Sequence, residues 1–555
     1  MYQIDGGYLI AQALKNEGIK YIFSVSGGVL NPIYRACEEI GIQIIHTRHE
    51  AAAVFMADGW ARTTGNPGVV LTTLGPGLTN VITGIFTAHL ATSPIIVISG
   101  QVNQSMQDMQ AGMAIDPIPL VSPITKWAKS VKETKRIPEY ISGAFRNALS
   151  GRPGPVFLEF PSEVLRHQIE RSEFEPHDPL NSRSHSRPQG DPKDIKRAVE
   201  LINNSERPLV IGGSGIFWSS AFNEFKALID LYELPFFLAR GGRGAVPENH
   251  PLYFGPGYIS ANPVLKDALK ETDLLILLGH RLDFDLNFGN PASLNRNVKI
   301  IQVDIEANEI GRYRPVHLGI VADAQSALHQ LTKTAIVKHK RSNHWLSDLE
   351  QARSNWEREN EETLSKEIVP MHPLHFLKGI FEILPRKSVL ISSHGNIDFW
   401  ADAYYRAYQP GSYLRAGQSG TLGAEIPYGL AAKLARPNET VVVIVGDGGF
   451  GYHCMELDTA SRYGIPLIIA IGNDASWGAI SLPQKRIYGR TFSTNLEFRN
   501  YERISEVLGG YGELVNSPMQ IGNALLNAMN SGLPSVLNVQ IASVESRYMQ
   551  EFSKE

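Results

Sequence analysis

The stretch VVVIVGDGGFGYHCMELDTASRYGIPLIIAIGNDASWG, residues 441–478, decides the fold of this chain. It predicts a buried strand, a Gly-Asp-Gly turn, a helix, a second buried strand and then Asn473-Asp474. An aspartate at one strand end and an oxygen ligand at the next can hold one hard cation between them. Asp447, Asp474 and the backbone carbonyl of Ser476 are therefore candidate ligands of Mg²⁺.

The glycines of the same turn suit a diphosphate, because Gly446, Gly448 and Gly449 let the backbone approach phosphate oxygens closely. Two alternatives stay open for this motif taken alone. Its glycines, ending at Gly451, also fit the GxGxxG fingerprint of an NAD-binding oxidoreductase. They could equally form a tight turn beside a helix-capping aspartate.

Composition places the chain among large globular proteins. At 555 residues it has room for about three domains. Its 52 Lys+Arg and 56 Asp+Glu give a formal net charge of −4, which implies no nucleic-acid partner. An amphipathic N-terminus, two isolated cysteines and the lack of a run of about 18 apolar residues predict a cytoplasmic protein without a membrane segment.

Apolar strands that alternate with helical patterns predict three doubly wound α/β domains with mainly parallel sheets. The expected domains are N-terminal (1–170), central (190–335) and C-terminal (365–545). Residues 171–192 are polar and rich in Pro and Ser, and they predict a linker. In the N-terminal domain the strand QIIHT (43–47) leads into Glu50, which is either a pocket carboxylate or a helix-starting acid favoured by the helix dipole.

Together these patterns resemble the thiamine diphosphate (ThDP) enzymes over essentially the whole chain. The segments RHEAAA (48–53), LGPGLTN (74–80), GRPGPVFLEFP (151–161) and GTLG (420–423) match in order with the GDG…ND stretch. The resemblance implies that Glu50 activates the pyrimidine ring and that Leu422 holds the cofactor bent. The other cofactor-binding residues it implies are Gly75, Asn80, Asn396, Gly420, Gly446, Gly448, Gly449, Ser476, Trp477 and Gly478.

In this family one subunit binds the pyrimidine and another the diphosphate, so the resemblance implies a homodimer or homotetramer. The segments TRHEAAA, MQAG, PITKWA and SWGA are most similar to benzaldehyde lyase. GHRLDFDLNFG (279–289) is more similar to acyl-CoA enzymes of the same branch. The implied activity is a lyase or carboligase acting on 2-hydroxy ketones, 2-oxo acids and aldehydes. The alternatives are acetolactate synthase-like transfer from pyruvate and a 2-hydroxyacyl-CoA lyase or oxalyl-CoA decarboxylase.

The benzaldehyde lyase pattern implies that Gln110 is catalytic and faces the substrate oxygen. It implies a substrate pocket formed by Gly28, Val29, Phe399, Ala479 and Leu482. Val29 replaces a histidine of that pattern, so its proton shuttle is missing; His394 and His453 are the nearest substitutes, and we expect both to be structural.

Two further departures are Asp474, in place of an asparagine, and Glu425, where a small residue is usual. In the central domain Arg281 and Asp304 are placed as in relatives that bind FAD or ADP, although they could form a structural pair. A family member that has lost catalysis is a further alternative, which the presence of Glu50 and Asp447 argues against.

Overall fold

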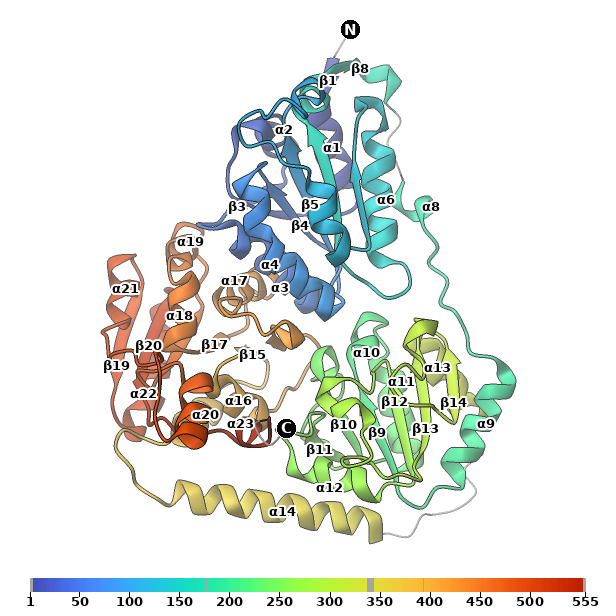
Figure 1. The fold of residues 1–555 in the computed structure, drawn as a ribbon, viewed down its shortest axis with the longest axis vertical. Coiled ribbons are helices and arrows are strands. Elements are labelled where there is room, and N and C mark those ends of the chain that lie inside the picture. Colours follow the sequence, from blue (N-terminus) through green and yellow to red (C-terminus); the bar gives the residue numbers. More distant parts are fainter. Residues whose placement is uncertain (1–2, 175–177, 337–343, 393, 553–555) are drawn as a thin grey trace.

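A computed structural model describes residues 3–174, 178–336, 344–392 and 394–552. Three six-stranded, entirely parallel sheets dominate it, and helices pack on both faces of each (Figure 1). This confirms the predicted fold class. The N-terminal domain lies at the top of Figure 1, with the central domain and the C-terminal domain side by side below it.

The N-terminal sheet has the order β3-β2-β4-β5-β7-β6. Its strands are β2 (Tyr21–Ser24), β3 (Gln43–His46), β4 (Gly68–Thr72), β5 (Ile95–Gln101), β6 (Trp127–Ser130) and β7 (Val156–Pro161). One face carries α1 (Gly6–Asn16), α2 (Asn31–Ile40) and α6 (Ile137–Leu149), and the other carries α3 (Glu50–Thr64) and α4 (Pro76–Ala91). Outside the sheet lie α5 (Pro117–Val121), α7 (Ser162–Arg166), α8 (Pro179–Ser182) and the antiparallel pair β1 (Gln3–Asp5) and β8 (Gln168–Glu170).

The central sheet has the order β11-β10-β9-β12-β13-β14, so the strand order reverses between β9 and β12. Its strands are β9 (Pro208–Gly212), β10 (Phe236–Leu238), β11 (Tyr253–Pro256), β12 (Leu274–Leu278), β13 (Lys299–Asp304) and β14 (Leu318–Val321). Its helices are α9 (Pro192–Asn203), α10 (Ser214–Trp218), α11 (Phe222–Tyr232), α12 (Pro263–Glu271) and α13 (Ala324–Thr334).

The C-terminal sheet has the order β16-β15-β17-β18-β20-β19, which is the connectivity of the N-terminal sheet repeated. Its strands are β15 (Val389–Ser392), β16 (Tyr413–Arg415), β17 (Val441–Gly446), β18 (Ile468–Asn473), β19 (Tyr511–Val515) and β20 (Ser535–Gln540). Its helices are α15 (Pro373–Phe381), α16 (Asn396–Tyr404), α17 (Glu425–Ala435), α18 (Asp447–His453), α19 (Glu456–Arg462), α20 (Gly478–Tyr488), α21 (Glu502–Val507), α22 (Pro518–Ser531) and α23 (Arg547–Phe552).

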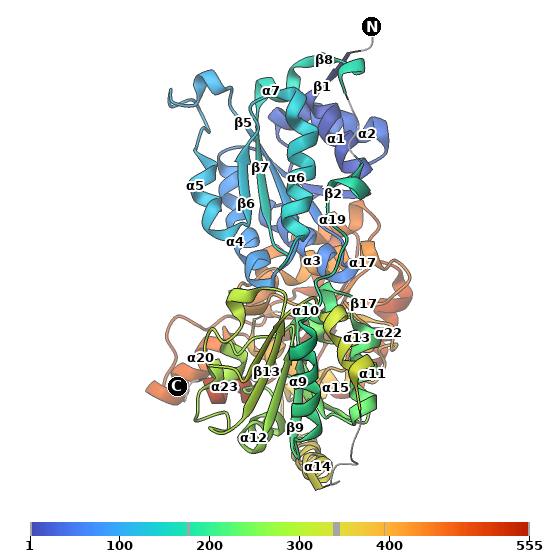
Figure 2. The ribbon, with the colours of Figure 1, turned by 90° about the vertical axis from the view of Figure 1, so that its right-hand side faces the viewer.

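Helix α14 (His344–Leu364) runs from the central domain to the C-terminal domain along the base of the molecule (Figures 1 and 2). Only a narrow stripe of it is buried, represented by Trp345, Leu349 and Trp356. The indole nitrogen of Trp345 donates to the carbonyl of Pro208 at 3.0 Å, which ties the helix to the start of β9.

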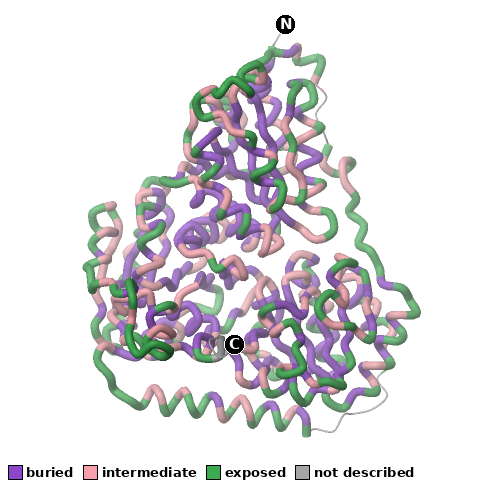
Figure 3. Tube along the Cα trace, viewed as in Figure 1, coloured by how far each residue is buried: buried purple, intermediate pink, exposed green. Residues whose placement is uncertain are grey.

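The N-terminal and C-terminal domains share one continuous buried core where α3 packs on α17 (Figure 3). The close approach explains why α3 is rich in small residues: a Cβ atom on Gly59 would lie 3.0 Å from the backbone of Tyr428. The Tyr428 hydroxyl donates to the buried Asp58 carboxylate at 2.5 Å. In the described part of the chain, no helix combines the length and apolarity needed to cross a membrane.

Candidate active site

The C-terminal sheet reverses its strand order between β15 and β17, and ligands of open α/β sheets bind at such a reversal, beyond the carboxyl ends of the strands. A cavity of about 190 Å³ lies there. Its lining includes Asn396, Gly420, Leu422, Gly446, Asp447, Gly448, Gly449, Asp474, Ser476, Trp477, Gly478 and Ala479. Every predicted cofactor and metal residue of the C-terminal domain therefore meets in one cavity.

Asp447 is the most buried acid of the predicted metal site, with 3% of its surface exposed. Its Oδ2 atom has no hydrogen-bond partner among the described residues. Burial, and then the charge of Asp474, raise the pKa of Asp447 to about 7. A buried carboxylate beside a second one is unfavourable without a counter-charge, and a bound cation supplies it.

Asp474 follows β18, and burial raises its pKa as well. The Ser543 hydroxyl donates to Asp474 Oδ2 at 2.9 Å and so orients the carboxylate. No group of three His, Cys, Asp or Glu side chains that could hold a metal occurs in the described ranges. A cation here would therefore have two carboxylates and backbone oxygen, with coordination positions left for phosphate and water, as Mg²⁺ prefers.

The glycines of this cavity are required for different reasons. A Cβ on Gly448 would lie 2.7 Å from the Trp477 ring, and one on Gly478 would lie 2.8 Å from Asp474 Oδ2. A Cβ on Gly451 would meet nothing within 4 Å. The third glycine of a dinucleotide-binding fingerprint is needed where the helix packs closely on the strand. Gly451 has no such close neighbour, so the geometry argues against an NAD-binding motif here.

Leu422 lines the cavity between two glycines in the left-handed region, Gly420 at φ +65° and Gly423 at φ +88°. A side chain on Gly423 would also collide with Tyr452, 2.6 Å away. The chain therefore makes a tight bend that presents Leu422 to the cavity. Asn396 lines the cavity too, but its side-chain oxygen and nitrogen both bond to the C-terminal segment, at Ser546 N and Val544 O.

The predicted residues of the N-terminal domain form a separate group. Asn80 Nδ2 donates to Glu50 Oε2 at 2.9 Å, at the start of α3. Gly75, at φ +61°, packs against the backbone of Met113. No described residue of the N-terminal domain lines the cavity that contains Asp447. Within one chain, the two halves of the predicted cofactor site do not meet.

The predicted substrate pocket is also incomplete in one chain. Gly28 and Gln110 are exposed, and Val29 packs against the backbone of Gly100 instead of lining the cavity. Phe399 is stacked on Tyr548 with ring centroids 4.0 Å apart. Neither Phe399 nor Leu482 lines the 190 Å³ cavity, whereas Ala479 does.

Eight residues that line the cavity were not predicted as site residues from the sequence: His394, Gly395, Ile397, Asp398, Glu425, Gly472, Ile480 and Ile541. Glu425 is 1% exposed and begins α17. His394 and Ile397 follow β15, and a strand end at the reversal point is the signal that could have found them.

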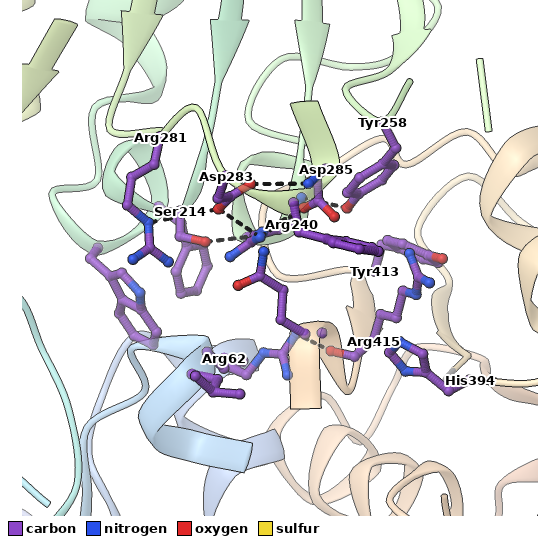
Figure 4. Close-up of a pocket in the computed structure, with 18 of the residues that line it drawn as sticks. Arg62, Ser214, Arg240, Tyr258, Arg281, Asp283, Asp285, His394, Tyr413 and Arg415 are labelled. Atoms are coloured by element: carbon purple, nitrogen blue, oxygen red, sulfur yellow. Dashed lines mark hydrogen bonds and ion pairs between the residues drawn. The ribbon is translucent and has the colours of Figure 1, made fainter. Parts of the chain in front are cut away.

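A second site lies at the reversal point of the central sheet. A cavity of about 540 Å³ there includes Asp304 and adjoins one of about 380 Å³ between the three domains, shown in Figure 4. Arg281 Nη1 lies 3.3 Å from Glu309, so the structure pairs Arg281 with Glu309. Burial raises the pKa of Asp304 to about 6.

Fold and site together define a three-domain α/β protein with a cavity of acidic side chains and glycine backbone at the strand ends of its C-terminal domain. Three family models agree: the "Thiamine pyrophosphate enzyme" N-terminal TPP binding domain matches residues 4–119, the central domain 195–331 and the C-terminal TPP binding domain 393–539. The chain belongs to the thiamine pyrophosphate enzymes, whose cofactor is thiamine diphosphate.

Similar proteins include acetolactate synthases and 2-hydroxyacyl-CoA lyases. A probable acetolactate synthase large subunit of Methanococcus aeolicus is 32% identical, over 97% of this chain and 92% of that protein. A 2-hydroxyacyl-CoA lyase 2 of Bos taurus is 32% identical, over 99% and 92%. The acetolactate synthase large subunit of Lactococcus lactis is 30% identical, over 98% and 93%.

Proposed function

We propose that this chain is a ThDP- and Mg²⁺-dependent enzyme that makes or breaks a C–C bond next to a carbonyl group. The observation that carries the proposal is the cavity that unites Asp447, Asp474, Leu422 and the glycine backbone at the strand ends. When bound, thiamine diphosphate supplies a nucleophilic carbon that adds to a carbonyl and accepts the electrons of the broken bond.

Different residues of the chain would hold different parts of this cofactor. Asp447, Asp474 and the Ser476 carbonyl would bind Mg²⁺ and through it the diphosphate. Glu50, oriented by Asn80, would hold a proton at the pyrimidine ring. Leu422 would press between the two rings from the cavity wall.

We propose that a second copy of the chain completes the site, in a homodimer or homotetramer. Glu50 lies outside the cavity of its own chain, which supports a shared site. Complementation tests this: Glu50→Gln and Asp447→Ala homodimers should both be inactive. A mixture refolded together should regain about a quarter of wild-type activity, because half of the dimers contain one intact site. No recovery would contradict the shared site.

For the reaction, we favour acetolactate synthase-like acyl transfer from pyruvate or 2-hydroxyacyl-CoA cleavage. The names of the relatives support these two over a benzaldehyde lyase-type reaction. Assays with pyruvate alone, with a 2-hydroxyacyl-CoA and with benzoin separate the three. Turnover of benzoin but of neither other substrate would contradict this preference.

We also propose that FAD or ADP occupies the central-domain cavity. It lies at the β9–β12 reversal point, as dinucleotide sites do in open α/β sheets, and its lining includes Arg281, Asp304, Gly215 and Gly279. The absorbance spectrum of the supernatant after denaturing freshly purified protein would identify the nucleotide. Failure of both nucleotides to bind or to raise the thermal midpoint would contradict this assignment.

A further inference from the structure

His394 occupies the carboxyl end of β15, directly at the reversal point of the C-terminal sheet. Its side chain lines the 190 Å³ cavity that contains Asp447 and also the 380 Å³ cavity between the domains. Of the described residues that line either cavity, His394 alone belongs to both. The imidazole thus stands where a molecule bound beside the cofactor would extend away from it.

The surroundings of His394 are unusual for a structural histidine. Its Nδ1 atom is buried and has no hydrogen-bond partner in the described part of the chain. Phe399 packs edge-on against the ring, with centroids 5.9 Å apart. Figure 4 shows Arg415 beside His394, and an ion pair of 2.8 Å between Arg415 and Asp402 holds that guanidinium in place.

His453, the other histidine near the cofactor motifs, differs from His394 because its side chain has a hydrogen-bond partner. Its Nδ1 atom is 2.8 Å from the carbonyl of Gly423, and its ring packs edge-on against His49 and Phe55. A backbone hydrogen bond of this kind fixes the tautomer and supports a structural role. No described residue bonds to Nδ1 of His394, and an unpartnered buried polar atom calls for an explanation such as catalysis or a bound ligand. The structure therefore separates the two histidines that the sequence treats alike.

We propose that the imidazole of His394 transfers the proton at the oxygen of the carbonyl substrate. This proposal rests on the proposed function. Burial, and then the charge of Arg415, lower the pKa of His394 to about 3, so the ring is neutral at physiological pH. A neutral imidazole has one nitrogen free to accept a proton and one N–H to donate.

When a bound 2-hydroxy compound is cleaved, its hydroxyl proton moves to the free imidazole nitrogen and the C–O bond becomes a carbonyl. The C–C bond breaks with its electron pair left on the acyl fragment. In the ligation direction the imidazolium returns the proton to the oxygen of the acceptor carbonyl as the C–C bond forms. Proton transfer by a positioned side chain contributes about 10²–10⁴-fold to rate.

The test compares His394→Ala and His394→Asn with wild type, using the donor substrate that wild type consumes. Both variants should lose about 10²-fold or more in kcat with KM changed little. Their thermal midpoints should rise with ThDP plus Mg²⁺ as much as that of wild type, because the cofactor contacts stay in place. Added imidazole should restore part of the turnover of His394→Ala, into whose cavity it fits.

His453→Asn is the matched control for a structural histidine. It should lower the thermal midpoint without cofactor and gain nothing from added imidazole. The proposal is overturned if both His394 variants keep kcat within threefold of wild type, or if they lose the cofactor-dependent rise in midpoint. A wild type that shows no such rise would overturn the proposed function itself, which distinguishes the two failures.

Discussion

Replacing Asp447 with Asn should stabilise the protein without cofactor and abolish its response to cofactor. Burial and the neighbouring Asp474 raise the pKa of Asp447 from 3.8 to about 7. Because the folded pKa lies above the unfolded one, wild type keeps full stability below pH 4 and loses it as the pH rises through 7. An Asn side chain of the same shape carries no charge and escapes this loss.

The magnitude follows from the shift. A rise of about three pKa units corresponds to a loss of at most about 4 kcal/mol in the free energy of unfolding of wild type at pH 8. Allowing half of that for relaxation and screening leaves about 2 kcal/mol, or about 4–8 °C in the midpoint of a domain of this size. At pH 5 the gain should shrink to about 1 kcal/mol, because the folded wild type is then largely protonated.

The assay compares the thermal midpoints of wild type and Asp447→Asn in EDTA at pH 5 and at pH 8. The measurement is then repeated without EDTA in the presence of saturating ThDP and Mg²⁺. Asp458→Asn is the control, since Asp458 is a partly exposed partner of Arg462 in the same domain, and its loss should cost less than about 1 kcal/mol. A lower midpoint for Asp447→Asn at pH 8 in EDTA would refute the reasoning, because it would show that Asp447 stabilises the empty site.

Glu50→Gln should slow exchange of the ThDP C2 proton, followed by NMR, by about 10²-fold or more; an unchanged exchange rate would remove Glu50 from the chemistry. Arg243→Met should cost about 3 kcal/mol in urea unfolding, because it leaves the buried Glu248 carboxylate without its cation; a loss below 1 kcal/mol would contradict this. His280 is buried with its pKa lowered to about 4, so the folded state binds fewer protons than the unfolded state and stability should rise from pH 4 to 6.5. His280→Asn should reduce this rise in the free energy of unfolding by up to about 3 kcal/mol, measured by urea unfolding across this pH range. An unchanged pH dependence would contradict the role of His280.

The fold was largely predictable because its signals are local. Buried parallel strands form continuous apolar runs such as VVVIV before Gly446, and glycine turns mark their ends. The strand order was not predictable in the same way. That the N-terminal and C-terminal sheets share one connectivity depends on contacts between strands far apart in the chain, which no local pattern records.

The residues of the candidate site likewise differ in how far the sequence predicts them. Asp447 and Asp474 lie in a motif whose spacing already places them at strand ends, Leu422 is implied by the family resemblance, and the structure brings all three into one cavity. Phe399 and Leu482 were assigned by similarity alone, and neither lines that cavity. His394 was expected to be structural because a lone histidine usually is; only its missing partner and its place between two cavities distinguish it.

Calorimetric titration of ThDP into the dialysed protein shows whether the chain binds this cofactor through Mg²⁺ at Asp447. We expect binding that requires Mg²⁺, that disappears in Asp447→Ala, and that NAD does not reproduce. Tight binding of NAD with no heat from ThDP in the presence of Mg²⁺ would contradict it and return the glycine turn to a dinucleotide site.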